Sequence, residues 1–386
     1  MSRRTNAPGR LRSHVMRIVS LLPAATELLH ALGATGSIVG RSHECDFPAP
    51  GSPDGDALAA TPTLTRQRTE FTSSAEVDRQ VSASMNERQS LYELDADRLR
   101  SLQPDVIVTQ DLCDVCSIDL AAVRRAAAAI DPPPAVVSLN PSSLEDVLED
   151  LVRLGEVIDR PAEAGRALVG LRERIDRAMS HVAPFAGGER VLFLEWTDPP
   201  FSGGHWTPQL IEMAGGEHPL NPTEPKPTAE RVTDADGSSR AAGPLLAERV
   251  AGKSRRIEPG EILLMDRQRP FDRVIVAPCG LDLEAAIAEV RKLLAGESEA
   301  EPADWFGRLE AVRGLSSDCL ARPLGAQNEG VSSKRRGTPR VVVVDGSAMF
   351  NRPGPRLVDA LEFLAATLQG RPEAMPRDFP AVGLVT

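Results

Sequence analysis

Six short, wholly apolar runs alternate with helical patterns along this chain, and they constrain its fold more than any other feature. Three runs lie in the first half and three in the second. Strands of this kind are typical of parallel sheets that helices cover on both faces. The sequence therefore predicts an α/β fold of two Rossmann-like lobes with parallel sheets. The runs are Arg17 to Leu21, Asp105 to Thr109, Ala135 to Leu139, Arg190 to Leu194, Asp272 to Val276 and Arg340 to Val344.

A continuous helical stretch separates the two halves. The capping box Ser142 to Glu145 begins it, and Pro161 begins a second helix. The apolar positions of the second helix keep a helical period for about 20 residues, or roughly 30 Å. This pattern also fits a surface helix of one lobe. Its place at the midpoint of the repeated strand pattern favours one long, rigid helix that joins the lobes, with a ligand cleft between them.

The same patterns give the domain boundaries. Two segments, at about 221–260 and 296–337, are rich in Pro, Gly, Ser and charge and have no counterpart in the first half, so we expect partly disordered surface insertions. The expected order is a disordered tail at 1–16, an N-terminal lobe at 17–141, linking helices at 142–183, a C-terminal lobe at 187–370 and a tail at 371–386.

Charge and hydropathy exclude several classes of partner. The net charge of −11 argues against nucleic acid, which demands a basic surface. No stretch has the roughly 18 consecutive apolar residues of a membrane span, so the chain is not expected to be membrane-embedded.

The N-terminus and the cysteine count bear on the compartment. Glu27 and His30 interrupt the apolar run that begins at Ile18, and no small-residue cleavage site follows, so no secretory signal is predicted. Five cysteines suit a reducing compartment. We therefore expect a cytoplasmic protein, with Met16 as an alternative start. A periplasmic location is the alternative if the start is misassigned or export is non-standard.

In doubly wound α/β lobes, ligands bind beyond the carboxyl ends of the strands. The richest of these predicted loops is Glu195 to Trp206, which gathers aromatic residues between a strand and a helix. Pocket walls are commonly aromatic, and a flat ligand favours such faces. The sequence therefore predicts a ligand site at this loop.

The segment Arg17 to Glu27, followed by Gly40 to Asp46, resembles the opening of substrate-binding proteins of ABC importers for cobalamin and iron-siderophores, and the cobalamin-binding branch is most similar. The resemblance implies a periplasmic-binding-protein-like fold of the helical-backbone class, with a corrinoid in the cleft, little hinge motion and an ABC permease as partner. The absent signal peptide and the two insertions depart from the family's pattern. Further matches are Asp111 to Cys116, Trp196 to Trp206, Met213 to Glu217, Ala277 to Gly280 and Asn351 to Arg356, so the resemblance covers most of 17–368.

A corrin is a roughly planar disc fringed with amides, so its site needs aromatic or proline faces and scattered hydrogen-bond partners. Core packing is the alternative for the tryptophans, and a surface ion pair is the alternative for Arg352. The predicted ligand-binding residues are Pro23, Ala24, Thr26, Ser42, His43, Glu44, Asp114, Trp196, Asp198, Pro199, Phe201, His205, Trp206, Phe350, Asn351 and Arg352.

Four cysteines, Cys45, Cys113, Cys116 and Cys279, fall on predicted cleft-side loops. They permit three interpretations. Free cysteines often serve as small buried apolar residues. A Cys-x-x-Cys pair with a third thiol and the imidazole of His43 also suits a soft-ligand metal site. The third interpretation is a redox dithiol with a lowered thiol pKa.

Motifs of common enzymes are missing from the sequence. It has no P-loop, no Gly-rich dinucleotide signature of the required form, no His-Glu-x-x-His and no Gly-x-Ser-x-Gly. We therefore predict non-catalytic binding of a corrinoid as a ligand, with no required cofactor. The alternatives are an iron-siderophore ligand, and a metal-binding or thiol-redox protein that uses the four cysteines.

Overall fold

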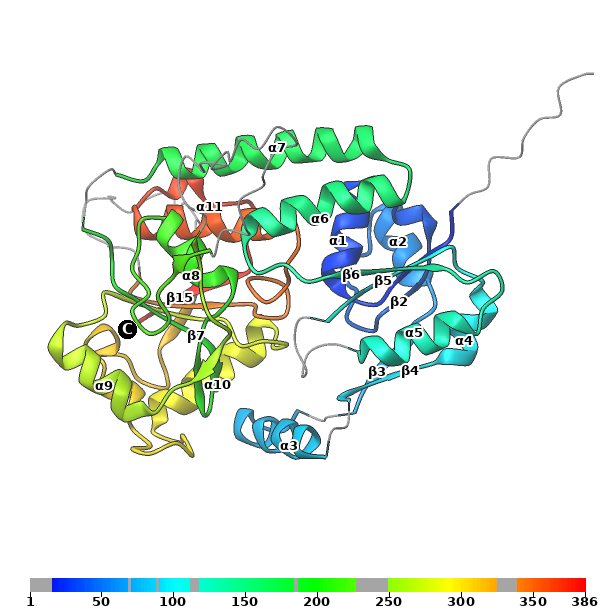
Figure 1. Cartoon of the computed structure of the whole chain (residues 1–386). Helices are drawn as coiled ribbons and strands as arrows, with labels where there is room; N and C mark the ends of the chain where they lie inside the picture. The colour runs from blue at the N-terminus through cyan, green and yellow to red at the C-terminus, as the bar shows by residue number, and fades with distance from the viewer. Residues whose placement is uncertain are drawn as a thin grey trace, which may run out of the picture.

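The computed structural model describes residues 16–68, 71–87, 90–111, 118–183, 187–226, 249–324 and 339–386. The chain forms two α/β lobes that lie side by side, with α6 and α7 running along one side of both (Figure 1). The predicted fold class is confirmed. No helix in these residues is long and apolar enough to cross a membrane.

The N-terminal lobe has a four-stranded, fully parallel sheet in the order β2-β1-β5-β6. The central strands β1 and β5 are almost completely buried because helices pack on both faces. The strands are β1 (Ile18–Ser20), β2 (Ile38–Arg41), β5 (Val106–Gln110) and β6 (Ala135–Leu139). The helices are α1 (Pro23–Ala31), α2 (Pro53–Ala60), α4 (Ala96–Leu102) and α5 (Leu120–Ala128).

The C-terminal lobe has a seven-stranded sheet in the order β11-β8-β7-β12-β14-β15-β13. The middle strands β7, β12 and β14 are parallel, while the strands on either side are antiparallel. The strands are β7 (Val191–Thr197), β8 (Pro200–Ser202), β11 (Arg255–Arg256), β12 (Arg273–Val276), β13 (Leu320–Pro323), β14 (Val341–Val344) and β15 (Ala381–Val385). The helices are α8 (Trp206–Met213), α9 (Pro259–Gln268), α10 (Leu283–Ala295) and α11 (Leu357–Leu368).

All six predicted apolar runs form strands, and the repeated order is visible in the pairing. In each lobe the first run pairs with the second, and the second with the third, always in parallel. The three strands that these runs form in one lobe therefore correspond to the three in the other, and so do the loops that follow their carboxyl ends.

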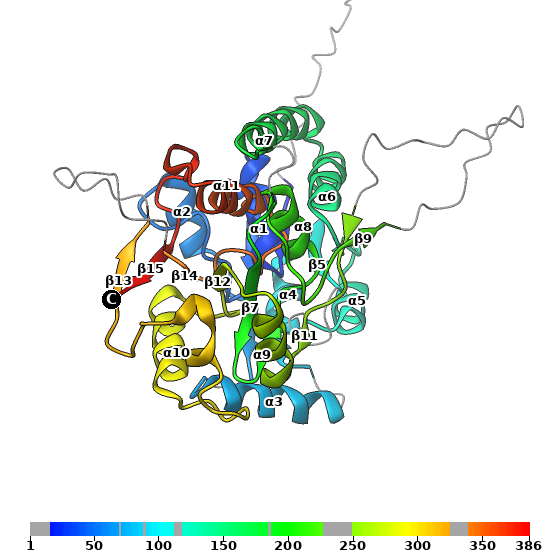
Figure 2. The same ribbon diagram turned by 90° about the vertical axis from the view of Figure 1, so that its left-hand side faces the viewer.

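Two helices connect the lobes. The N-cap of helix α6 (Leu144–Val157) is Ser143, whose side chain accepts a hydrogen bond from the Asp146 amide at 3.2 Å. This cap lies one residue after Ser142, at which the predicted capping box Ser142 to Glu145 begins. Helix α7 (Pro161–Ser180) lies against α6 and reaches across both lobes (Figures 1 and 2). One apolar core, built from the side chains of both lobes and of these two helices, is continuous on this side of the molecule.

The prediction of a surface insertion at 296–337 is wrong for the part of this segment that the structure describes. Trp305 and Phe306 have no exposed surface, and Leu309 and Val312 pack with them in the core of the C-terminal lobe. Local composition suggested a loop because Pro, Ser and charge surround these four residues. Their burial depends on strands that are distant in sequence.

The predicted C-terminal tail at 371–386 also differs from the structure. Residues 381–385 form β15, which lies between β14 and β13 inside the sheet. In the other insertion, at 221–260, the described ends form a two-stranded pair, β9 (Glu224–Pro225) with β10 (Arg249–Val250), and then β11, which extends the sheet from β8.

A helical excursion leaves the N-terminal lobe between two short antiparallel strands, β3 (Thr65–Gln67) and β4 (Tyr92–Leu94). Its helix, α3 (Ser74–Asn86), lies below the C-terminal lobe on the side away from α7 (Figures 1 and 2). The lobes are thus bridged on one side by α6 and α7 and on the other by α3.

Candidate functional site

The predicted aromatic loop folds into the hairpin β7–β8 and the first turn of α8. Trp196 and Phe201 pair across the hairpin. Both side chains are half-buried, as are those of Pro199 and His205. The indole Nε1 of Trp196 donates to the backbone carbonyl of Ser74 in α3 at 3.1 Å. The hairpin therefore faces the N-terminal part of the chain across the lobe boundary.

Trp206 and Phe350 fasten two loops of the C-terminal lobe to each other. Trp206 is 5% exposed, and its Nε1 donates to the carbonyl of Phe350 at 2.5 Å. The Phe350 ring packs at 4.9 Å from Phe193 in β7. Both rings thus belong to the apolar core, as the core-packing alternative proposes for Trp206. Their contacts fix the positions of the two loops.

Backbone strain marks the same two loops. His205 and Phe350 have φ angles of 54° and 64°, in the left-handed region that non-glycine residues rarely adopt. The imidazole of His205 stacks at 5.4 Å from the Trp206 ring, and burial together with Lys253 lowers the pKa of His205. Strain of this kind clusters at ligand sites, where the surrounding structure must stabilise it.

Asp198 is buried and accepts three hydrogen bonds from the segment after α10. The donors are the Ser298 hydroxyl at 3.1 Å and the amides of Glu299 at 2.7 Å and Ala300 at 3.2 Å. In this arrangement the carboxylate of Asp198 orders a loop of its own lobe.

The N-terminal lobe contributes a polar wall from the segment after β2. His43 Nδ1 lies 2.7 Å from the Thr65 hydroxyl, and the Tyr92 hydroxyl donates to Glu44 at 3.1 Å. Burial lowers the pKa of His43, while the neighbouring Glu44 acts in the opposite direction. His43 Nε2 is buried and has no hydrogen-bond partner among the described residues.

A buried hydroxyl and thiol network lies behind this wall. The Thr26 hydroxyl contacts Ser20 Oγ at 2.8 Å and donates to Cys45 Sγ at 3.0 Å. Thr26 and Ser42 are 0% and 3% exposed. Thr26 bonds Ser20 and Cys45, while the Ser42 hydroxyl accepts a hydrogen bond from Thr65 at 3.1 Å, and together these bonds position the loop after β2.

An ionic cluster joins the lobes next to this network. Arg352, in the loop before α11, pairs with Asp46 of the N-terminal lobe. Glu27 in α1 lies 3.8 Å from Arg352 and 3.6 Å from Arg356. Neither oxygen of Glu27 has a hydrogen-bond partner among the described residues, and burial raises the pKa of Glu27 to about 7.

Of the four predicted cleft-side cysteines, one is buried, one is half-buried and two lie outside the residues that the structure describes. Cys45 is 3% exposed, and burial raises the pKa of its thiol to about 11. Cys279 is half-buried. Cys113 and Cys116 lie outside the described residues. Where side chains are described, no three His, Cys, Asp or Glu residues converge as a metal site.

The predicted ligand residues therefore fall into three groups. The first group is half-buried, and the second is buried in its own lobe or in the ionic cluster. Asp114 lies outside the described residues. The half-buried group is Pro23, His43, Glu44, Trp196, Pro199, Phe201, His205 and Asn351, and the buried group is Ala24, Thr26, Ser42, Asp198, Trp206, Phe350 and Arg352.

The sequence reasoning did not identify Ser74 and Glu289 at the lobe boundary. The Ser74 hydroxyl lies 2.8 Å from Thr197 Oγ1 and donates to Glu289 at 2.5 Å. The capping pattern Ser73 to Glu76 was available as a sign of a helix. Nothing local shows that this helix docks on the other lobe.

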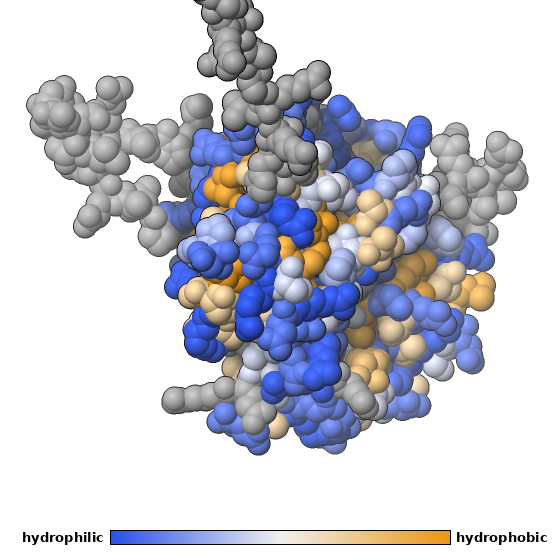
Figure 3. Space-filling model, turned by 90° about the vertical axis from the view of Figure 1, so that its right-hand side faces the viewer, coloured by the Kyte–Doolittle hydropathy of each residue, from blue (hydrophilic) through white to orange (hydrophobic). Residues whose placement is uncertain are grey.

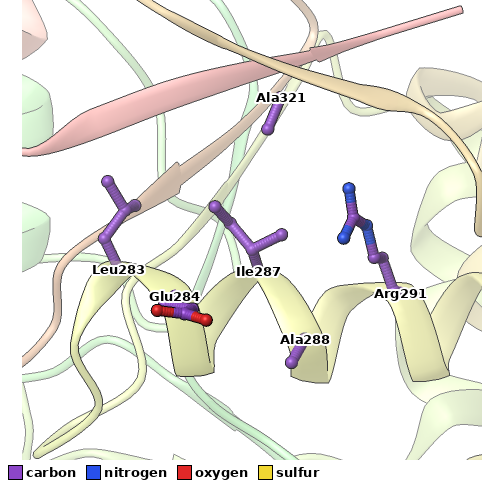
Figure 4. A pocket seen from close by; sticks show the side chains of 6 residues that line it. All are labelled: Leu283, Glu284, Ile287, Ala288, Arg291 and Ala321. Carbon is purple, nitrogen blue, oxygen red and sulfur yellow. The ribbon is translucent and has the colours of Figure 1, made fainter.

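A separate groove of about 430 Å³ belongs to the C-terminal lobe alone. Leu283 and Ile287 extend from α10 toward the strand that carries Ala321 (Figure 4). No residue of the N-terminal lobe lines this groove, so it is distinct from the lobe boundary. The outer face of the N-terminal lobe is mostly hydrophilic, with apolar side chains in separate groups (Figure 3).

Comparisons with solved structures agree with this architecture. A periplasmic heme-binding protein from Pseudomonas aeruginosa shares 18% identity, covers 96% of this chain and 98% of its own, and gives a TM-score of 0.58. The periplasmic vitamin B12-binding protein BtuF of Vibrio cholerae shares 15% identity over 92% of this chain and 97% of its own, with a TM-score of 0.53.

An ABC-type Fe3+-hydroxamate transport protein from Saccharomonospora viridis shares 19% identity over 91% of this chain and 92% of its own, with a TM-score of 0.52. No protein-family model matches the sequence, and no match was found among curated proteins. The comparisons with solved structures show that the chain has the two-lobe fold of these periplasmic binding proteins.

Proposed function

We propose that this chain is a non-catalytic binding protein that holds a corrinoid between its lobes. The observation that carries the proposal is the β7–β8 hairpin, which brings the half-buried aromatic side chains of Trp196 and Phe201 to the lobe boundary. Aromatic faces on one wall and polar groups on the other suit a planar ligand fringed with amides. His43 and Glu44 supply polar groups in the N-terminal lobe.

The structural neighbours support small-ligand binding in such a cleft, and their names include heme, vitamin B12 and Fe3+-hydroxamate. The aromatic hairpin favours a macrocycle over a hydroxamate, because a macrocycle offers an extended flat face to both rings. The resemblance of the sequence to the cobalamin-binding branch favours a corrinoid over heme. An iron-siderophore is the alternative ligand.

The partner and compartment follow from the same proposal. In the periplasm, the protein would deliver its ligand to the permease of an ABC uptake system. In the cytoplasm, it would act as a corrinoid carrier or sensor. Fractionation of cells that express the chain from Met1 distinguishes these roles. Recovery in the periplasm with a shortened N-terminus would overturn the cytoplasmic role.

The second candidate function uses the cysteines as a metal or thiol-redox site. The buried thiol of Cys45, with its raised pKa, suits an apolar packing role better than a thiolate ligand. The candidate therefore depends on Cys113, Cys116 and Cys279. Zinc analysis of the purified chain, together with thiol titration before and after chelation, decides it.

The binding proposal is tested by visible-absorbance titration with aquocobalamin, with hemin and a ferric trihydroxamate in parallel. We expect saturable binding of aquocobalamin below about 100 μM. Phe201→Ala and Trp196→Ala should each weaken binding by about tenfold, or roughly 1.4 kcal/mol. The control Leu264→Ala removes a side chain on α9 that is 56% exposed and should change nothing. Tighter binding of hemin or the hydroxamate would replace the corrinoid assignment, and no binding of any probe would overturn the proposal.

A further inference from the structure

Helix α3 belongs to the N-terminal lobe by sequence but is anchored on the C-terminal lobe by its first turn. Its anchor is Ser74, which is completely buried. The Ser74 carbonyl accepts from Trp196, and the Ser74 hydroxyl contacts Thr197 and Glu289. Glu289 is also paired with Lys292 at 2.6 Å. Every one of these partners lies on β7 or α10.

Two ion pairs continue the contact along α3. Asp78 pairs with Arg256 of β11, and Arg79 pairs with Glu299 at 2.5 Å. The Arg256 guanidinium also lies 5.8 Å from the centre of the Phe201 ring. Through Ser74 and Asp78, α3 therefore stands over Trp196 and Phe201, the two aromatic residues of the proposed ligand site.

This contact is almost entirely polar. No side chain of α3 belongs to any of the three apolar cores that the described residues form. Ser74 and Ala75 are its only buried residues, while Met85 is 50% exposed. Exposed ion pairs contribute little because water screens them, and segments with few buried apolar contacts open at the lowest free energy. On the opposite side, α6 and α7 join the lobes through a continuous apolar core.

The space beneath α3 is small. A cavity of about 60 Å³ lies between the first turn of α3 and the C-terminal lobe, and Asp198, Glu289 and Lys292 line it. Sites for small ligands typically measure about 300–1,000 Å³. A planar macrocycle therefore does not fit in this cavity, whose lining residues include neither Trp196 nor Phe201.

We propose that α3 is a lid, which covers Trp196 and Phe201 in this structure and detaches from the C-terminal lobe to admit the ligand. The lid deepens the proposed function and rests on it. Its polar contacts break and re-form as a unit at Ser74 and Asp78, while the apolar core around α6 and α7 keeps the lobes together. Ligand size is then limited by how far α3 can withdraw.

Hydrogen exchange of the ligand-free full-length chain tests whether α3 detaches. We expect α3 amides to exchange at least 100-fold faster than those of α11, which is nearly all buried. The double variant Ser74→Ala with Asp78→Asn should speed exchange in α3 by about tenfold and leave α11 unchanged. The matched control is Glu93→Gln. This substitution breaks the ion pairs of Glu93 with Arg66 and Arg68 beside the strand pair β3 and β4, and it leaves the contacts with the C-terminal lobe unchanged.

Stopped-flow mixing with aquocobalamin, and with hemin, tests whether detachment admits the ligand. The double variant should raise the association rate about tenfold, whereas Glu93→Gln should not. Exchange of α3 as slow as that of α11, or faster exchange without faster association, would overturn the lid. If neither probe binds at all, the proposed ligand fails, and the exchange experiment still decides whether α3 detaches.

Discussion

Arg352 of the C-terminal lobe and Asp46 of the N-terminal lobe form an ion pair across the lobe boundary, with Nη2 to Oδ2 at 2.9 Å. Arg352 is 8% exposed, so this pair holds the loop before α11 against the loop after β2. The guanidinium also lies 3.8 Å from the carboxylate of Glu27, which is fully buried. At the lobe boundary, Glu27 is therefore the group whose ionisation we expect to change the free energy of unfolding most.

The first prediction concerns the pH dependence of stability. Burial raises the pKa of Glu27 from 4.5 to about 7, although Arg356 and Arg352 oppose the shift. A raised carboxyl pKa means that the folded chain binds a proton that the unfolded chain has lost. The carboxylate of Glu27 therefore destabilises the fold increasingly from about pH 4.5 to pH 7, by about 3 kcal/mol in total.

Glu27→Gln removes that titration. Relative to the natural chain, the variant should gain about 3 kcal/mol in the free energy of unfolding between pH 4.5 and pH 8. Urea unfolding of both proteins at the two pH values measures the difference, and all other titrations cancel in it. A difference that does not change with pH would show that folding does not raise the pKa of Glu27.

The second prediction concerns thiol reactivity. With a pKa of about 11, the Cys45 thiol is only about one thousandth thiolate at pH 8, and it is also 3% exposed. Iodoacetamide should therefore label Cys45 more than 100-fold more slowly than the half-buried Cys279, as read by peptide mass spectrometry. Labelling of both at equal rates, under conditions where the protein stays folded, would contradict the buried network around Thr26.

The third prediction concerns the segment that its composition identifies as a surface insertion. Trp305 is completely buried beside Phe306, with ring centres 5.4 Å apart. Trp305→Ala should destabilise the protein by about 3–5 kcal/mol, because it leaves a large cavity. Trp305→Phe should cost much less, since it keeps a ring and removes an indole N–H that has no partner among the described residues. Denaturant unfolding compares the two, and a cost below about 1 kcal/mol for Trp305→Ala would support a surface insertion.

The fourth prediction concerns the C-terminus. Leu384 in β15 is 3% exposed and lies opposite Val341 on one side and Ala321 on the other. Leu384→Ala should cost about 2–5 kcal/mol. The control Glu373→Ala changes an exposed side chain before β15 and should stay within about 0.5 kcal/mol. Equal free energies of unfolding for the two variants would support the prediction that residues 371–386 form a tail.

The sequence by itself determined the strands, the linking helices and the two-lobe plan. Central strands buried on both faces form nearly continuous apolar runs, so Val191 to Leu194 and Val341 to Val344 could be identified without any partner. Helix α6 was predicted because capping signals are local in the chain, although its N-cap is Ser143 and not the predicted Ser142. The aromatic content of the hairpin at Trp196 was equally visible.

Only the tertiary structure decided which of those residues face the lobe boundary. Trp206 and Arg352 were predicted to bind ligand, but their polar groups bond Phe350 and Asp46, which are distant in sequence. The placement of β15, the burial of Trp305 and the docking of α3 on Glu289 have the same physical cause. Pairing between distant segments depends on how the elements pack in space, and no local pattern of residues encodes it.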